Sequence, residues 1–532
     1  MAESAPPSPR GVDAVLAYHQ RTKHSLKAYA AGPEALDWDA QPNPFRSFAG
    51  APLLQLALPA GPLDASFAEI HRPGAIKPAP LNLDTLGSLL RYAFGLAAWK
   101  EFGPDRWALR CAPSSGNLHP TEAYVVARDI EGLSDGLYHY RPREHALERR
   151  CAATMMHGAG GLWIGLSSIH WREAWKYGER ALRYCLLDAG HELGALRYSA
   201  AGLGWRADVV EGVSSAEIAA LLGLDRVEDF AGAEREEPEL LISISADGAA
   251  QAAPAIEQGV WLGRANLLDP RPMYRWPIVE QAAHASRGQC APSREDFAEL
   301  PGLARQSAAK ASDLILQRRS AQRFDARTLM PTAWFFNLLD ALLPRPSTPP
   351  FDAWRKPARL HPVLFVHRVE GFAPGLYILP RRPEAEADLR AALNPDFAWT
   401  RIENAPAHLP LYLLQLGDAR HVARTIACAQ WIASDGCFSL GLLSEFGASV
   451  RANAHAYRAL HYEAGLLGQA LYLEAEAAGF RGTGIGCFFD DDFHRFLGLS
   501  GDAFQSLYHF TIGFPKTDSR IVTTPPYPES RP

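Results

Sequence analysis

Two stretches of this chain match one another at a constant offset of 275 positions, residues 182–224 with residues 457–499. Eleven of the 43 aligned pairs are identical, and both stretches end in Leu-Gly-Leu. Earlier segments repeat at a slightly different offset, for example Leu118-His119-Pro120 and Leu360-His361-Pro362. The period far exceeds the roughly 20–50 residues of solenoid repeats. We therefore expect a duplication, with two similar domains that pack on each other like a covalent pseudo-dimer.

Helical and strand-like patterns recur in both halves. An amphipathic helical pattern that ends at a glycine opens each repeat, over residues 182–204 and 457–479. Helices alternating with short strands predict the α+β class, with a central sheet between helices. The expected strands are Glu122–Arg128, Leu162–Ile169 and Glu239–Ile244, then Pro362–His367, Leu411–Leu416 and Tyr508–Gly513. The predicted divisions are a leader (1–65), a first domain (66–246), a connector rich in Ala and Pro (247–309) and a second domain (310–532).

Composition restricts the partners of the chain. With 532 residues, 47% of them hydrophobic, it can build more than one core. A net charge of −6 without a basic block argues against nucleic acid, and no apolar run reaches the roughly 20 residues of a membrane span. The N-terminus lacks the apolar core of a secretory signal, and seven cysteines without a Cys-x-x-Cys pair indicate reduced thiols. We expect a cytoplasmic protein with no metal site, no nucleic-acid partner and no membrane partner.

A polar turn precedes the first expected strand of the first half. It consists of Pro113, Ser114, Ser115, Gly116 and Asn117, and we call residues 113–117 the serine turn. Two hydroxyls and an amide on a tight loop can hold the polar edge of a flat cofactor through short hydrogen bonds. The same residue types also fill ordinary turns, so a turn that only caps a strand is the alternative interpretation.

The serine turn resembles the flavin-contacting turn of the nitroreductase superfamily, whose members bind FMN at the seam between two subunits. Over nearly its whole length the chain is similar to the tandem SagB/ThcOx dehydrogenases, which use FMN to oxidise azoline rings of modified peptides. Its leader carries that family's pattern in Tyr18-His19, Thr22-Lys23-His24, Leu36-Asp37-Trp38 and Gln41–Arg46. The resemblance implies two tandem nitroreductase-like domains, each with a mostly antiparallel sheet flanked by helices, that form a pseudo-dimer within one chain.

Three features of the second half resemble parts of the superfamily's FMN site. Arg318-Arg319-Ser320 match its Arg-Arg-Ser opening, and arginine forks suit a phosphate. Gly484-Ile485-Gly486 match a segment whose backbone can approach the flavin ring and offer N–H groups. Lys516 and Arg520 match the basic pair that completes the phosphate pocket. Outside this context the same residues are typical of a helix end, a turn and a charged tail.

Neither half keeps every piece of such a site. The first half has Glu69–Gly74 where the arginines would stand and Val209-Val210-Glu211 opposite the glycines. The second half has Trp354–Arg359 in place of a serine turn. In the superfamily each flavin takes the serine turn from one subunit and the arginines and glycines from the other. Only one such combination is complete here, so the resemblance implies one FMN per chain, held between the halves.

Lys176 and Tyr177 stand where azoline dehydrogenases have a Lys-Tyr pair implicated in catalysis, and the second half lacks this pair. By that resemblance they are the candidate catalytic residues. A lysine with a pKa lowered by partial burial could accept the proton that leaves with a hydride, and a tyrosine hydroxyl could relay it. A surface lysine beside a packing tyrosine is the alternative. We expect the repeated Arg206/Arg481 pair to be structural.

Three functions are compatible with these features. The first is an FMN-dependent dehydrogenase or oxidase that acts on an azoline-like heterocycle or a peptide-derived substrate, with dioxygen reoxidising the flavin. Because a fold does not fix the direction of electron flow, an NAD(P)H-dependent nitro- or quinone reductase is the second. The third is a non-catalytic partner that presents a peptide to another enzyme of a modification complex. The duplication is compatible with a monomer and with a further oligomer.

Overall fold

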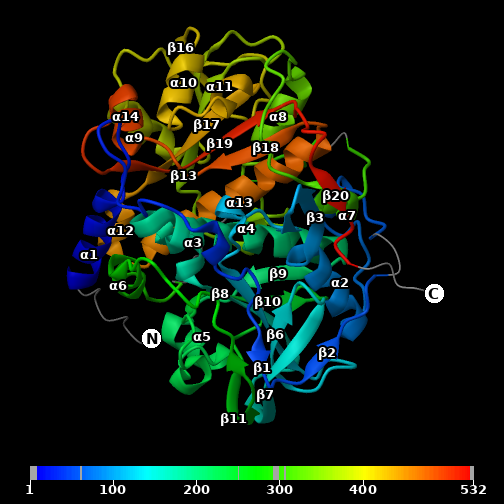
Figure 1. Cartoon of the computed structure of the whole chain (residues 1–532). Coiled ribbons are helices and arrows are strands. Elements are labelled where there is room, and N and C mark those ends of the chain that lie inside the picture. Colours follow the sequence, from blue (N-terminus) through cyan, green and yellow to red (C-terminus); the bar gives the residue numbers. More distant parts are fainter. Residues whose placement is uncertain are drawn as a thin grey trace.

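The computed structural model describes residues 9–59, 63–249, 251–290, 297, 299–304 and 307–527. Two large sheets, one from each half of the chain, lie on either side of a central layer of helices (Figure 1). Helices α4 (Ala181–Gly202) and α13 (Ala456–Ala477) form the middle of that layer and pack against each other. All strand pairs in the two sheets are antiparallel. This architecture confirms the predicted α+β pseudo-dimer.

Five strands follow the same order in each sheet. The strands of the first sheet are β2 (Leu53–Gln55), β5 (Thr121–Arg128), β6 (Gly136–Arg141), β7 (Ala146–His157), β8 (Gly161–Ser168), β9 (Arg206–Val209), β10 (Glu237–Ser245) and β11 (Ala255–Trp261). Those of the second are β13 (Leu360–Val366), β14 (Gly375–Ile378), β15 (Thr400–Arg401), β16 (Tyr412–Leu416), β17 (Phe438–Glu445), β18 (Arg481–Ile485) and β19 (Phe504–Gly513). The shared order is β6-β5-β8-β10-β9 in the first sheet and β14-β13-β17-β19-β18 in the second. The duplication inferred from the repeat therefore extends to the topology.

The six predicted strands lie close to observed ones, and the strands that were not predicted include the central one of the second sheet. Strand β17 was not predicted, because Gly441 and two serines interrupt its apolar run. The structure explains the glycine: a Cβ at Gly441 would lie 2.6 Å from the ring of Phe493, which packs there. The predicted strand at Leu411–Leu416 is β16, which lies near one end of the sheet.

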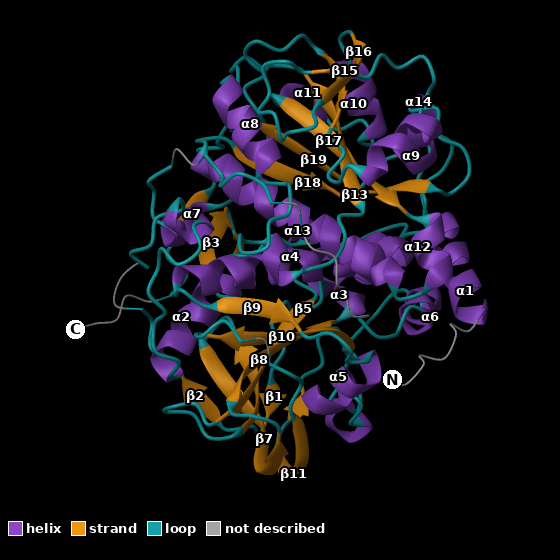
Figure 2. Ribbon diagram, turned by 180° about the vertical axis from the view of Figure 1, so that it is seen from behind, coloured by secondary structure: helices purple, strands orange, loops and turns teal. Residues whose placement is uncertain are grey.

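The central helices approach closely at a glycine that the repeat preserves in both halves. A Cβ added to Gly190 would lie 2.2 Å from the carbonyl oxygen of Tyr462, and one added to Gly465 would lie 2.0 Å from that of Leu187. Both distances are far below any normal contact. The identity of the Ala-Gly pair in the two repeats is therefore explained by close packing, because no side chain fits between the two helix backbones. Helices α4 and α13 lie side by side at the centre of the molecule (Figure 2).

The predicted leader and connector both add to the first half. Strand β2, which belongs to the leader, and strand β11, which belongs to the connector, both pair with β7. The expected boundaries at residues 65 and 246 therefore do not coincide with the edges of this sheet. The short strands β1 (Phe48–Ala49) and β12 (Arg264–Ala265) also join the leader to the connector, and α1 (Pro9–Arg21) packs on α6 (Pro277–Ala285).

The end of the chain returns to the first half. A hairpin of β3 (Leu96–Phe102) and β4 (Asp105–Arg110) pairs with β20 (Val522–Thr524), which follows the last strand of the second sheet. The remaining helices are α2 (Leu83–Ala93), α3 (His170–Tyr177), α5 (Ser215–Leu222), α7 (Ala311–Gln317), α8 (Thr332–Asp340), α9 (Glu384–Ala392), α10 (Arg420–Ile426), α11 (Ile432–Asp435), α12 (Gly447–Ala452) and α14 (Asp490–Phe496). Within the described ranges no helix is long and apolar enough to cross a bilayer.

Candidate functional site

A cavity of about 690 Å³ lies where the serine turn meets the second half of the chain. Arg318 joins the two halves at its wall: its Nε donates to the carbonyl oxygen of Cys111 at 3.0 Å, and its Nη2 to that of Arg110 at 3.1 Å. Eleven of the twelve predicted cofactor-binding residues and one of the two catalytic candidates line the cavity. They are Pro113, Ser114, Ser115, Asn117, Tyr177, Arg318, Arg319, Ser320, Gly484, Ile485, Gly486 and Lys516, so Arg520 and Lys176 are the predicted site residues outside this lining.

The serine turn is held by a carboxylate that sequence reasoning missed. Asp188, on α4, accepts hydrogen bonds from the backbone N–H of Ser115 at 3.1 Å and from its hydroxyl at 2.9 Å. Burial raises the pKa of Asp188 to about 7, although hydrogen bonds from Ser114 and Ser115 oppose the rise. Gly116 adopts a φ of 59°, which a glycine reaches without strain. Because Ser115 is engaged by Asp188, the turn is a fixed part of the cavity wall.

Four cationic side chains line the cavity, and of the two carboxylates in the same lining Asp188 holds the serine turn and Asp518 pairs with Arg520. We call Lys100, Arg319, Arg481 and Lys516 the cation cluster. Burial and the nearby Arg318 lower the pKa of Arg319 to about 10, and burial, Arg319 and Arg481 lower that of Lys100. Glu476 offers one carboxylate, 3.3 Å from the Arg481 Nε. Cations that lower one another's pKa are stabilised when an anion binds among them.

Two arginines lie at positions that differ from those expected from the sequence. Arg481, expected to be structural, lines the cavity. Arg520, expected at the phosphate, is 72% exposed, pairs with Asp518 at 2.6 Å and lies over the ring of Phe102 outside the cavity lining. Residues 515–519 and Ile521 line the cavity, so the main chain stays at its wall while the Arg520 side chain does not contribute to the lining. Arg206, the counterpart of Arg481 in the other half, pairs with Asp208 at 2.9 Å.

The glycines of the second half make room for tyrosines. A Cβ at Gly484 would lie 1.7 Å from the hydroxyl oxygen of Tyr508, and one at Gly486 would lie 2.0 Å from the ring of Tyr184. Both tyrosines line the cavity. The N–H of Gly484 donates to the Tyr472 hydroxyl at 2.9 Å. The missing side chains therefore bring aromatic rings against strand β18 and narrow the cavity at this point.

His191 places a buried imidazole in the cavity lining. Its Nε2 lies 3.0 Å from the Tyr508 hydroxyl, and its buried Nδ1 has no hydrogen-bond partner among the described residues. Burial, followed by the charge of Arg318, lowers the pKa of His191 to about 3, so the ring is neutral. An uncharged imidazole with one free nitrogen in a cavity lining suits a hydrogen bond to a bound ligand.

Tyr177 and Lys176 stand over the serine turn. A Cβ at Gly116 would lie 2.6 Å from the Tyr177 hydroxyl and 3.2 Å from the Lys176 Nζ. Burial lowers the pKa of Lys176, although the charge of Glu173 opposes it, and burial raises that of Tyr177 well above its usual value. Glu173 is itself fully buried, and its two carboxylate oxygens have no hydrogen-bond partner among the described residues. Burial raises its pKa well above the usual range, which favours the neutral acid.

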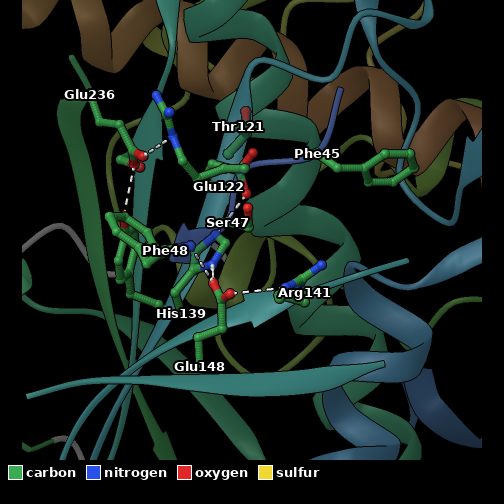
Figure 3. Close-up of polar contacts among 12 residues, drawn as sticks. Phe45, Ser47, Phe48, Thr121, Glu122, His139, Arg141, Glu148 and Glu236 are labelled. Atoms are coloured by element: carbon green, nitrogen blue, oxygen red, sulfur yellow. Dashed lines mark hydrogen bonds and ion pairs between the residues drawn. The ribbon is translucent and has the colours of Figure 1, made fainter. Parts of the chain in front are cut away.

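A buried polar network fixes α3, which carries Lys176 and Tyr177, against the strand that follows the serine turn. Arg172 on α3 donates from Nη1 to Glu122 at 2.5 Å and to the carbonyl oxygen of His119 at 2.7 Å. His139 lies between Glu122 at 2.9 Å and Glu148 at 3.1 Å (Figure 3). Burial opposes a charge on His139, but the hydrogen bonds to the two carboxylates raise its pKa to about 8.

The equivalent seam on the other side of the molecule is filled. Its cavity measures only about 10 Å³. Lys356, at the position that corresponds to Ser114, forms an ion pair with Glu211 across this seam. Trp354 is buried and packs edge-on against Tyr462, with ring centroids 6.0 Å apart. Side chains thus occupy the place that the serine turn leaves open on the first side.

Comparison with known proteins agrees with this architecture. Residues 75–233 and 444–514 match the Nitroreductase family. A crystal structure of a "putative nitroreductase" from Anabaena variabilis superposes with a TM-score of 0.70 at 21% identity and covers 94% of this chain and 99% of that one. Residues 75–233 and 444–514 are therefore similar to that family, and the chain has the nitroreductase fold.

Two curated proteins are similar over shorter stretches. The "Putative nitroreductase MJ1384" of Methanocaldococcus jannaschii is 28% identical over 125 residues, which cover 21% of this chain and 60% of that protein. The trifolitoxin-processing protein TfxB of Rhizobium leguminosarum bv. trifolii is 37% identical over 73 residues, which cover 13% of this chain and 20% of that protein. Each match spans less than two thirds of the relative.

Proposed function

We propose that this chain binds one FMN in the seam cavity and uses it to remove a hydride and a proton from an azoline-like heterocycle or another peptide-derived substrate. One observation carries the proposal: the serine turn of one half and the arginines and glycines of the other border a single large cavity, while the equivalent seam is filled. Its volume lies within the about 300–1,000 Å³ of small-molecule sites. The similarity to a trifolitoxin-processing protein supports a peptide-derived substrate.

The donor set of the cavity fits FMN. The cation cluster offers charged donors to a phosphate that carries nearly two negative charges, and Arg319 and Arg481 are its two arginine forks. The serine turn, the neutral His191 and the tyrosines beside β18 supply polar and aromatic contacts for a flat ring. Bound FMN would accept the hydride, because two-electron transfer is the chemistry that flavins supply.

Lys176 and Tyr177 would handle the proton. Partial burial favours the neutral amine of Lys176, which is the form that can accept a proton. The Tyr177 hydroxyl lines the cavity and can bridge the substrate and the amine. Glu173, whose buried carboxylate has no hydrogen-bond partner within the described part of the chain, would interact with the charge that forms on Lys176. The network of Arg172, Glu122 and His139 would hold both side chains in place.

The purified protein should be yellow and contain one FMN per chain. Lys176→Ala should retain the flavin spectrum and lose most of its turnover, because general-base catalysis contributes about 10²–10⁴-fold. Lys356→Ala, at the filled seam, is the matched control and should keep both properties. Undiminished turnover of Lys176→Ala would remove Lys176 from the mechanism. Rapid bleaching of the flavin by NADPH would favour a nitro- or quinone reductase instead, and a colourless protein that takes up no FMN would favour a non-catalytic partner.

A further inference from the structure

Two cysteines meet at the edge of the seam cavity. Cys487 lines the cavity directly after Gly486, and Cys428 lies in the loop after α10. Their sulfur atoms are 2.6 Å apart, and both residues are partly exposed, whereas the other five cysteines of the chain are buried. A small shift of one side chain would bring the sulfurs to the roughly 2.05 Å of a disulfide bond.

The surroundings of Cys487 favour its thiolate. The Nδ1 of His24 accepts a hydrogen bond from the N–H of Ala30 at 2.8 Å, which leaves Nε2 as the protonated ring nitrogen. His24 hydrogen-bonds to Cys487, and Arg180 adds a positive charge nearby. The contact with Cys428, followed by His24, lowers the pKa of the Cys487 thiol. A thiolate is the form of cysteine that attacks disulfides.

The backbone presents Cys428 in an uncommon way. Cys428 and Ala429 have φ angles of 52° and 59°, in the left-handed region that non-glycine residues seldom adopt. The Cβ of an L-residue crowds the following carbonyl oxygen in this region, so both residues are strained. Gln430, which follows, lines the cavity and lies with its Nε2 3.3 Å from the carbonyl oxygen of Cys487. The surrounding structure thus holds this loop in a strained conformation that points Cys428 at Cys487.

We infer that Cys428 and Cys487 form a thiol–disulfide exchange site that low-molecular-weight disulfides such as oxidised glutathione convert to an intramolecular disulfide. The Cys487 thiolate attacks one sulfur of the small disulfide, forms a mixed disulfide and releases one thiolate. Cys428 then loses its proton and attacks the Cys487 sulfur, which releases the second thiolate. The small disulfide is reduced to two thiols and the cysteine pair is oxidised by two electrons. The reaction needs no flavin and is independent of the function proposed above.

The bond would join two walls of the cavity. One is the loop that carries Gln430, and the other is the segment from Gly486 to Asp490, on which the leader also rests through an isolated bridge between His24 and Phe489. Disulfides in reducing compartments are usually transient and serve redox sensing or catalysis. Because Cys487 stands in the cavity lining, its oxidation state would alter the cavity wall.

The full-length protein, reduced and then equilibrated with reduced and oxidised glutathione at graded ratios, provides the test. Peptide mapping by mass spectrometry should find Cys428 joined to Cys487, with reversal by excess thiol. Cys428→Ser should accumulate one glutathione on Cys487, while Cys487→Ser should react at least about tenfold more slowly, since an ordinary thiol is only a few per cent thiolate at pH 7. Cys437→Ser, which removes a buried thiol, should behave like the unaltered protein.

Peptide mapping of the unaltered protein keeps the test decisive even where a variant folds poorly. Absence of the 428–487 linkage at every glutathione ratio would overturn the inference. So would disulfides that form preferentially with other cysteines, or a Cys428→Ser protein that leaves Cys487 unmodified.

Discussion

Arg481→Ala and Arg520→Ala form a matched pair of variants. They test whether the arginine suggested by the structure or the one suggested by the sequence pattern binds the phosphate of FMN. Arg481 lines the cavity and is 27% exposed, whereas Arg520 is 72% exposed and pairs with Asp518. A hydrogen bond to a charged group contributes about 1.5–3 kcal/mol. Partial exposure and the relief of repulsion with Lys100 place Arg481 at the lower end, about 1.5–2 kcal/mol. Arg481→Ala should therefore weaken FMN binding by about 10- to 30-fold.

Fluorescence titration of the apoprotein with FMN measures both variants directly. Arg520→Ala should bind within about twofold of the unaltered protein, because exposed ion pairs contribute little. The deficit of Arg481→Ala should shrink at about 1 M salt, where charge interactions are screened within about 3 Å. Equal losses in the two variants, or a loss only in Arg520→Ala, would refute the assignment of the cation cluster as the phosphate site. Riboflavin, which lacks the phosphate, should bind both variants equally.

Three further predictions concern stability. Gly465→Ala should lower the free energy of unfolding by about 3 kcal/mol or more, since its Cβ would lie 2.0 Å from a backbone oxygen of the facing helix, while Gly302→Ala, with open space around it, should be neutral in thermal melts. His139, with a pKa raised to about 8, should contribute about 2 kcal/mol below pH 6.5 that is lost as the pH rises through 8, and melting temperatures of His139→Gln should lack this dependence. Because burial raises the pKa of Asp188 to about 7, the free energy of unfolding should fall by about 4 kcal/mol as the pH rises from 4 to 7. Asp188→Asn should therefore melt at a higher temperature than the unaltered protein at pH 8 and at the same temperature at pH 4. Equal melting curves at pH 8 would contradict the burial argument.

Local sequence patterns predicted those elements well whose own residues show a clear apolar periodicity and a clear end. The helices at 181–202 and 456–477 have long apolar patterns and end near a glycine, so their positions were predicted within about two residues at each end. The repeat itself predicted the pseudo-dimer. The β3–β4 hairpin and its partner β20 were not predicted, because β20 is a three-residue strand whose partner lies more than four hundred positions earlier.

The site was predicted as far as a short motif could locate it. Serine, arginine and glycine motifs met at one cavity, but Asp188, His191 and Lys100 belong to no motif and face the cavity only because distant segments pack together. Arg520 shows the converse: its spacing after Lys516 fits a basic pair, yet its side chain is exposed and pairs with Asp518 outside the cavity lining. A glycine in the sequence also does not show which neighbouring group occupies the space that a side chain would fill. At Gly484 and Gly486 that group is a tyrosine side chain.

The filled second seam changes how this molecule can saturate and vary. In a symmetric dimer each substitution alters two pockets at once and one ligand can influence a second. Here Lys356 and Glu211 occupy the companion position, so a titration of the cavity should follow a single hyperbola with no cooperativity within the chain. The residues of the filled seam have no ligand to contact. They only pack the two halves together and so support the cavity on the other side.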